Sequence, residues 1–301
     1  ENINQLTAPN YDGFPLDLYL SPEPVLPVQF SRGCYYKDCA FCALTLDHQN
    51  FRQRDPGKTV DDLVWLKERY GAQSFFFTDE CFALSPTKRL CQQMIDRQVN
   101  VKWTCELRFE KNLTRELLGQ MRDAGCLKIV FGLESFNQRV MDFMKKGIKQ
   151  ESVRRIVDDC VDLGIAVHCY VIVGFPTEKE EEALDTMNFV VGNKKLHESY
   201  GFSCQPCLFD LEKEAPIMSD PGSYGIRRIM RPATEDLSLG FFYEVQEGMT
   251  PAQAEQLYQQ VYEKISEVVC ELPFNYSMAD GLLYIARAKS QALQVPQPTG
   301  S

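Results

Sequence analysis

The chain has 301 residues, of which 44% are hydrophobic and 25% charged, and its formal net charge is −10. This balance predicts a globular protein with one large domain, or one domain and a small appendage, and the acidity argues against nucleic-acid binding because no basic face is available for counterion release. No apolar run reaches eighteen residues and no signal-peptide pattern occurs, so neither a membrane span nor secretion is predicted.

The basic residue pairs and the cysteines indicate the kind of surface and the compartment of the protein. The basic pairs Lys145-Lys146 and Arg227-Arg228 are expected to be solvated surface. Twelve cysteines would indicate disulfides only in a short secreted chain, and most of them lie in apolar segments where a free thiol behaves as a small hydrophobe. A reducing cytoplasm is the compartment that this pattern favours.

Residues 1–24 are punctuated by turn-forming residues, among them Pro9, Asp12-Gly13 and Pro15. This composition predicts an extended linker rather than a domain. Because Glu1 is not a methionine, we expect the chain to be the later part of something longer.

Three closely spaced cysteines follow a short apolar strand predicted over 25–30. Cys34, Cys39 and Cys42 are separated by gaps of four and two residues, so one loop can wrap three thiolates around a soft metal centre at a small cost in loop entropy. A closed structural zinc site or an ordinary iron–sulfur cluster takes four protein ligands. Three cysteines therefore leave one metal position for a small molecule.

Two other interpretations of these cysteines stay open. His48 lies six residues after Cys42 and could complete a Cys3His zinc site in a structural protein or binding module. A disulfide knot is the weaker alternative, because the rest of the chain does not resemble a small secreted scaffold.

Strand and helix patterns alternate regularly along the next part of the chain. The predicted strands are 25–30, 73–78, 101–107, 127–133, 165–173 and 202–209, and the predicted helices are 59–70, 86–98, 114–124, 138–145, 151–163 and 178–191. Consecutive right-handed crossovers of this kind build a parallel sheet covered by helices. Six units are too few for a closed eight-fold barrel, so a curved, partly open barrel is predicted over 25–209.

The regular alternation of predicted strands and helices ends after Asp210. Helices are expected over 251–271 and 279–293, the first with apolar residues on one stripe and proline at its opening. Residues 210–301 are therefore predicted to form a mainly helical extension that caps the barrel or bounds a substrate cavity.

Several stretches together resemble one known family. The loop containing Gly33-Cys34, Cys39 and Phe41-Cys42, with the later Gly132–Ser135 and Gly174–Glu178, is similar to the motifs of the radical S-adenosylmethionine (AdoMet) enzymes, although the first cysteine gap is one residue longer than the commonest spacing. The resemblance implies an α/β fold, a partial (β/α)6 TIM-like barrel. It also implies that the three cysteines hold an oxygen-sensitive [4Fe–4S] cluster, that AdoMet chelates the fourth iron, and that Phe41 packs beside the adenine.

Further AdoMet contacts are expected at the carboxyl ends of the strands, where ligands bind in parallel α/β sheets. The resemblance places there Asp79 and Glu80, Glu134 and Ser135, and Gly174 and Phe175. Arg108 directly follows the strand predicted over 101–107, where its planar guanidinium could pair with the AdoMet carboxylate. Structural alternatives remain for three of these places: a capping acidic turn at 79–80, a surface ion pair for Arg108, and a strand stopped by glycine and proline after 173.

Other reactive side chains are expected to be structural. Cys105, His168 and Tyr170 lie on predicted strands, where core packing is the favoured role. Cys204 and Cys207 form a second pair on the last predicted strand, but no further cysteines nearby would complete an auxiliary cluster.

On this resemblance the chain is expected to cleave AdoMet reductively and to form a 5′-deoxyadenosyl radical that abstracts hydrogen from a peptide or natural product. An electron donor such as flavodoxin or ferredoxin would then be a partner. Residues 11–24 resemble the linker that follows a cobalamin-binding domain in a large subgroup, so cobalamin-dependent methyl transfer, with that domain outside this chain, is the main enzymatic alternative.

Overall fold

The computed structural model describes residues 2–19, 23–44, 50–193, 195, 202–231 and 240–268. Its centre is a six-stranded sheet in the order β1-β4-β5-β6-β7-β8. All five pairings are parallel. The strands are β1 (Val25–Val28), β4 (Ser74–Phe77), β5 (Lys102–Leu107), β6 (Cys126–Glu134), β7 (Ala166–Val173) and β8 (Ser203–Leu208). The six predicted strands are confirmed.

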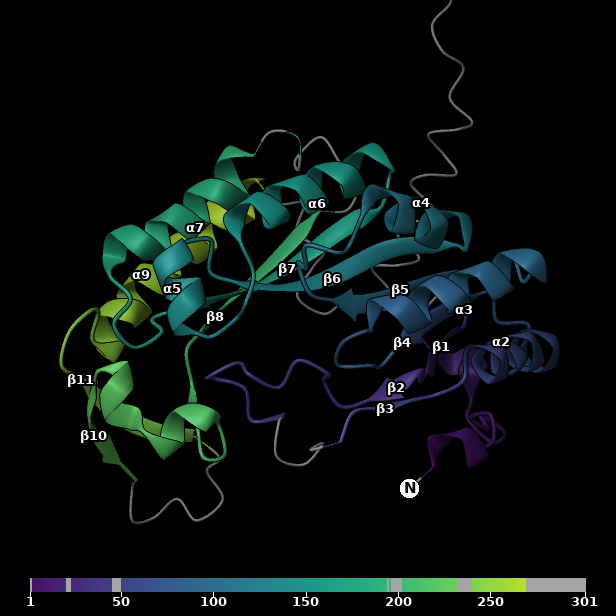
Figure 1. Ribbon diagram of the computed structural model, residues 1–301, viewed down its shortest axis with the longest axis horizontal. Coiled ribbons are helices and arrows are strands. Elements are labelled where there is room, and N and C mark those ends of the chain that lie inside the picture. The colour runs from purple at the N-terminus through teal and green to yellow at the C-terminus, as the bar shows by residue number, and fades with distance from the viewer. Residues whose placement is uncertain are drawn as a thin grey trace, which may run out of the picture.

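Helices connect successive strands and lie on the outer side of the curved sheet (Figure 1). They are α2 (Pro56–Tyr70), α3 (Leu84–Asp96), α4 (Arg115–Asp123), α5 (Gln138–Phe143), α6 (Gln150–Asp162) and α7 (Glu180–Gly192). Their ends follow ordinary capping chemistry: the Thr114 side chain accepts from the Leu117 amide at the start of α4, and Gly71 ends α2 with a φ of 67°. The partial (β/α)6 TIM-like barrel is confirmed.

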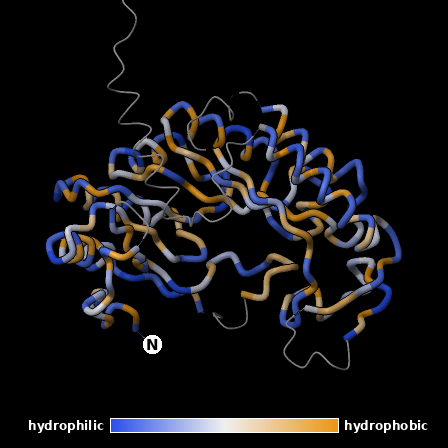
Figure 2. The backbone as a smooth tube through the Cα atoms, turned by 180° about the vertical axis from the view of Figure 1, so that it is seen from behind, coloured by the Kyte–Doolittle hydropathy of each residue, from blue (hydrophilic) through white to orange (hydrophobic). Residues whose placement is uncertain are grey.

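The main core lies between the sheet and these helices. On β7, Val167, Cys169 and Val171 belong to it, as does Cys105 on β5. Because side chains alternate along a strand, the intervening His168 and Tyr170 lie on the concave face. Figure 2 shows orange and blue alternating along the covering helices, as expected for helices with one apolar face. The concave face is therefore left for polar groups.

The chain after β8 forms a small antiparallel sheet that the sequence did not predict. It contains β9 (Leu211–Glu212), β10 (Ile226–Met230) and β11 (Gly240–Val245), in the order β10-β11-β9. Two 3-10 helices, Pro216–Ser219 and Pro221–Tyr224, precede β10. Helix α9 (Pro251–Val268) follows and packs against α7 and β8. The helix expected over 279–293 lies outside the described residues.

The first residues lie against the barrel. Two 3-10 helices occur, Ile3–Gln5 and Leu16–Leu18. The Arg54 guanidinium donates to the carbonyl oxygens of Ile3 (3.1 Å) and Leu6 (2.9 Å), which fixes this segment beside α2. Among the described residues, no helix has the length and apolar character needed to cross a bilayer.

Candidate functional site

The cysteine loop begins at strand β2 (Ser31–Arg32), which pairs with β3 (Arg52–Gln53). The carboxylate of Asp79, just after β4, accepts hydrogen bonds from the Phe30 amide (2.9 Å), the Ser31 hydroxyl (2.6 Å) and the Ser31 amide. The Glu80 carboxylate accepts from the Gly33 amide at 3.0 Å. Two acidic residues therefore fix the chain directly before Cys34.

Asp79 is only 1% exposed, and burial raises its pKa to about 7. Both of its carboxylate oxygens already accept hydrogen bonds from the protein. Its contact with AdoMet stays a prediction, and the structure shows it supporting the loop. The capping acidic turn, kept open above, is close to what is observed, although the group held is a strand and not a helix.

The three thiols of the loop have different neighbours. A hydrogen bond with Cys81, a buried residue after β4, lowers the pKa of Cys34 to about 6. The Sγ of Cys39 lies 3.6 Å from Nη1 of Arg108. Burial, together with the neighbouring Cys39 and Cys34, raises the pKa of Cys42 to about 11.

The three loop thiols that the structure describes do not form a site for a single metal ion. In the described part of the chain, no three Cys, His, Asp or Glu side chains converge enough to hold a metal ion. A four-iron cluster binds its thiolates through separate iron atoms, so it takes sulfurs spread around a loop. The Arg108 guanidinium lies 3.6 Å from the Cys39 sulfur, and the Lys146 ammonium is also near enough to interact with it electrostatically, so two buried cations favour negative charge there. His48, the fourth ligand of the zinc alternative, lies outside the described residues.

The far end of the loop is held by two other parts of the chain. The Ala40 amide donates to the Met144 carbonyl (2.9 Å), and the Ala40 carbonyl accepts from the Ile217 amide (2.8 Å). Phe41 packs on the second apolar cluster of the protein, and the Lys146 ammonium lies 5.5 Å from its ring centroid. The loop is thereby clamped between the end of α5 and the C-terminal segment.

A buried ion pair lies beside this loop. The Lys146 Nζ is 2.8 Å from the Glu134 Oε1, and the two side chains are 7% and 10% exposed. Burial opposes the Lys146 charge, but Glu134 and the Cys39 sulfur together outweigh burial, and the pKa of the ammonium is raised. The prediction that Lys146 is solvated surface is wrong; Lys145 is exposed as expected. The reason is the turn after α5, which points the second lysine inward.

Glu134 is placed by an irregular end of β6. Its φ is +62°, and the pairing of β6 with β7 shifts register between Gly132 and Glu134. A Cβ on Gly132 would lie 2.5 Å from the Glu134 Oε1 and 2.7 Å from the Lys146 Nζ, so a glycine here leaves room for the ion pair. Uncommon backbone geometry of this kind clusters at functional sites.

Ser135 faces the side of the sheet that is covered by α7, opposite to Glu134. It is fully buried, its hydroxyl lies 3.2 Å from the Thr186 hydroxyl on α7, and it accepts from the Asn137 amide (3.1 Å). These contacts fix the start of α5. Because the Ser135 hydroxyl is used there, we do not include Ser135 among the AdoMet contacts proposed below.

The stretch after β7 combines an unusual backbone with a buried aromatic residue. Gly174 has a φ of +85°, a Cβ there would collide with Ala254, and its amide donates to the Glu178 Oε2 at 2.7 Å. Phe175 is 1% exposed and packs edge-on against Phe209. The amide and the carbonyl of Gly174 are thus both bonded within the protein, Ala254 fills the space beside its Cα, and Phe175 serves as core. The AdoMet contact of this stretch stays a prediction.

The remaining candidates are structural, as predicted for most of them. The His168 Nδ1 lies 2.7 Å from the Ser203 hydroxyl, and burial lowers the pKa of His168 to about 3. Cys204 packs on the main core, whereas the Cys207 thiol donates to the Val171 carbonyl (3.3 Å). The two cysteines therefore have different surroundings on β8.

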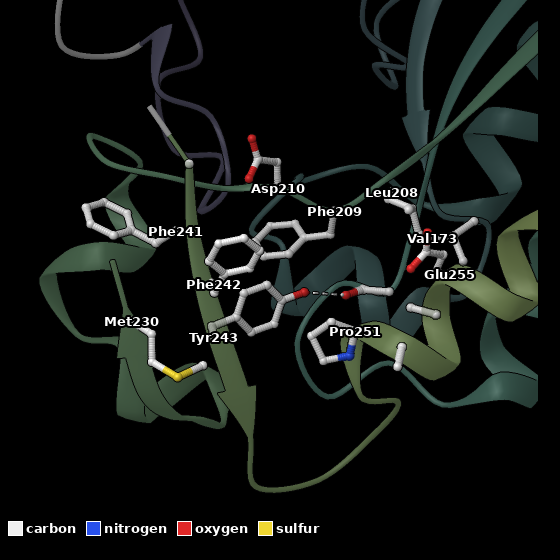
Figure 3. Close-up of a pocket in the computed structure, with 14 residues that line it drawn as sticks. Val173, Leu208, Phe209, Asp210, Met230, Phe241, Phe242, Tyr243, Pro251 and Glu255 are labelled. Carbon is white, nitrogen blue, oxygen red and sulfur yellow. Dashed lines mark hydrogen bonds between the residues drawn. The ribbon is translucent and has the colours of Figure 1, made fainter. Parts of the chain in front are cut away.

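A cavity of about 840 Å³ lies between the ends of β7 and β8, strand β11 and the start of α9. The Tyr243 hydroxyl donates to the Gly174 carbonyl oxygen at 3.4 Å. Figure 3 shows Tyr243 and Asp210 on opposite sides of the other aromatic residues. The C-terminal segment therefore bounds a cavity at the carboxyl end of the sheet.

Sequence reasoning missed two residues of the site, Lys146 and Cys81. A lysine pair in a polar segment gives no sign that one member is buried. Cys81 follows a predicted strand end only two residues after Asp79, which was the available signal for a thiol beside the loop.

The comparisons agree with this geometry. The family model of the radical SAM superfamily matches residues 28–190. A 204-residue stretch is 28% identical to an uncharacterized methyltransferase of Pyrococcus horikoshii and covers 66% of this chain and 43% of that protein. Another stretch is 30% identical to the anaerobic magnesium-protoporphyrin IX monomethyl ester cyclase of Rubrivivax gelatinosus, covering 52% of this chain and 29% of that protein. The chain spans less than half the length of these relatives.

Solved structures share the fold. The radical S-adenosylmethionine methyltransferase TsrM of Kitasatospora setae, solved with cobalamin and a [4Fe–4S] cluster, has a TM-score of 0.61 at 16% identity over 91% of this chain and 62% of that chain. The cobalamin-dependent S-adenosylmethionine radical enzyme OxsB has a TM-score of 0.54 at 15% identity over 100% of this chain and 40% of that chain. At these identities the likeness is one of fold.

Proposed function

Because the chain belongs to the radical SAM superfamily, we propose that Cys34, Cys39 and Cys42 are the cluster ligands of a radical SAM enzyme. A [4Fe–4S] cluster and AdoMet are the cofactors of this family, and when bound they supply the one-electron chemistry that makes a carbon radical. The observation that carries the proposal is the position of the loop: it lies at the carboxyl ends of β4, β5 and β6, beside buried cations that suit an anionic cluster.

Side chains next to the loop are proposed to hold AdoMet. Phe41 would offer its ring to the adenine, and Glu134 would accept hydrogen bonds from polar groups of AdoMet. The stretch at Gly174 would contact the adenine, as the resemblance implies. Glu80 would act on the same ligand through the loop that it supports. These assignments follow the resemblance and, for Phe41, Glu80 and Glu134, the positions of the residues in or beside the cysteine loop.

The proposed reaction is hydrogen abstraction from an unactivated carbon of a small molecule or peptide. The work of the protein is to orient the substrate and to keep water away from the radical. The polar concave face and the cavity bounded by β11 and α9 are suited to such positioning. An external one-electron donor, such as flavodoxin or ferredoxin, is part of this proposal.

Cobalamin-dependent methyl transfer is the second candidate. Relatives named methyltransferases favour it, and cobalamin would have to be held by a part of the protein outside this chain. Methyl transfer leaves S-adenosylhomocysteine, whereas hydrogen abstraction leaves 5′-deoxyadenosine. The ratio of these two products, measured with and without added cobalamin, separates the two reactions.

All eleven cysteines that the structure describes are free thiols. This supports the cytoplasmic location expected from the sequence, because a reducing compartment keeps such thiols reduced.

The experiment that tests the proposed function uses one loop cysteine and one core cysteine. Under anaerobic conditions with dithionite and AdoMet, Cys39→Ala should lose at least about 90% of 5′-deoxyadenosine formation and most of its iron, since a three-ligand site cannot spare a ligand. Cys160→Ala, in the buried face of α6, should keep both. Unchanged product formation by Cys39→Ala would refute the ligand assignment.

A further inference from the structure

Arg108 is buried beside a proposed cluster ligand. It follows β5, it is 5% exposed, and its Nη1 lies within hydrogen-bond distance of the Cys39 Sγ, at 3.6 Å. A sulfur acceptor takes longer hydrogen bonds than oxygen does. This contact differs from the role expected from its position at a strand end, in which the guanidinium would bind the AdoMet carboxylate.

Three neighbours hold the guanidinium in this position. Its Nη2 donates to the Lys146 carbonyl oxygen, its Nε lies 3.5 Å from the Glu110 carboxylate, and its Cζ lies 3.4 Å from the centroid of the Tyr36 ring. The Tyr36 hydroxyl donates to the Lys145 carbonyl oxygen at 2.8 Å, which fixes the ring. A planar, delocalised cation stacked on an aromatic ring is well ordered.

We propose that Arg108 is a positioning residue that raises the reduction potential of the cluster by donating a hydrogen bond to Cys39. This inference rests on the proposed function, because it needs the cluster on these cysteines. Reduction adds one electron from an external donor and one negative charge to the cluster. A nearby guanidinium and a hydrogen bond to a sulfur ligand both stabilise that charge, and such bonds are among the determinants of cluster potentials.

The test is a redox titration of the reconstituted protein without AdoMet, followed by the EPR signal of the reduced cluster. Arg108→Gln should make reduction about tenfold less favourable, which for one electron is a shift of about 59 mV to a more negative potential. Lys102→Met removes a positive charge from the opposite end of β5 and should leave the potential unchanged.

Glu110→Gln tests the direction in which nearby charge shifts the reduction potential. Removing a negative charge that lies 3.5 Å from the guanidinium should shift the potential in the positive direction. Glu110 is partly exposed, so this variant keeps the proposal testable even if Arg108→Gln does not fold.

Two outcomes overturn the inference. An unchanged potential in both variants excludes a role in tuning. An unchanged potential in Arg108→Gln with weaker AdoMet binding, measured by the AdoMet-dependent change of the EPR signal, returns the residue to the carboxylate-binding role. A wild-type protein without iron would contradict the proposed function and the inference with it, whereas an iron-loaded wild type with an unchanged Arg108→Gln potential contradicts the inference alone.

Discussion

At the scale of single residues, charge is held inside the barrel by pairing. Glu134 and Lys146 are both nearly buried and lie 2.8 Å apart. Replacing both charged side chains changes the unfolding free energy little. Replacing only one lowers it, because the other charge stays buried without a partner. The pair therefore constrains the turn after α5 and, through it, the loop that contacts Met144.

Lys146→Met tests this pairing. The variant should lose about 3 kcal/mol of unfolding free energy, because the Glu134 carboxylate stays buried without its partner. Urea denaturation at pH 7 gives the value. In the double variant Lys146→Met/Glu134→Gln most of the lost unfolding free energy should be recovered. A Lys146→Met variant as stable as the wild type would show that the ion pair does not contribute to stability.

Glu178 is predicted to make the protein less stable as the pH rises. Burial raises its pKa to about 8, its Oε2 accepts from the Gly174 amide, and no described residue donates to its Oε1. The folded state keeps the proton between the unfolded pKa near 4.5 and the folded value, so stability decreases as the pH rises through this window. Asp79 and Glu106, both with a pKa raised to about 7 by burial, act in the same direction.

Glu178→Gln should therefore be more stable than the wild type at pH 9, on the order of a few kcal/mol, and similar to it at pH 4.5. Urea midpoints at the two values measure the difference. Glu151→Gln, at an exposed position of α6, is the matched control and should follow the wild type. A parallel pH dependence in both variants would contradict the role of Glu178.

At the scale of elements, strand β2 depends on one side chain from the next unit of the barrel. Asp79→Ala should leave the amides of Phe30 and Ser31 without their acceptor. Amide hydrogen exchange there should become about tenfold to a hundredfold faster, since an unsatisfied buried donor costs about 1–3 kcal/mol. The Val130 amide in the middle of β6 is the internal control. Equal protection of the loop in variant and wild type would refute the support that we assign to Asp79.

The regular elements were predictable from sequence because each carries its own signal. A nearly continuous apolar run marked β7, and Thr114 and Gly125 bracketed α4. The sheet β9-β11-β10 carried no such signal, because β9 has only two residues and β10 contains exposed arginines. Its stability comes from packing Tyr243 and its neighbours on Phe209, a tertiary effect.

The site was predictable only in part, for the same reason. Cysteine spacing in one loop identified three residues, whereas the inward turn of Lys146 and the orientation of Ser135 toward Thr186 depend on how β6 ends. The pairing of β6 with β7 shifts register between Gly132 and Glu134, and Glu134 has a φ of +62°, so side-chain directions at this end of β6 do not follow regular strand alternation. Sequence periodicity gives no warning of an irregularity of this kind.

At the scale of the whole molecule, the helices and the cysteine loop lie on different sides of the sheet (Figure 1). The convex face is covered by α2 to α7, and the loop is attached at its start by Asp79 and Glu80 and at its far end by contacts of Ala40 with Met144 and Ile217. The C-terminal segment therefore supports the site from a distance in sequence. This arrangement fixes the loop while leaving the carboxyl ends of the strands for ligands.

The most direct measurement of the central claim is the EPR spectrum of the reduced, anaerobically reconstituted protein before and after addition of AdoMet. Three cysteine ligands predict about four irons per chain and one iron without a protein ligand, so AdoMet should change the spectrum. A colourless protein with one zinc, or a reduced cluster whose spectrum AdoMet leaves unchanged, would contradict the account.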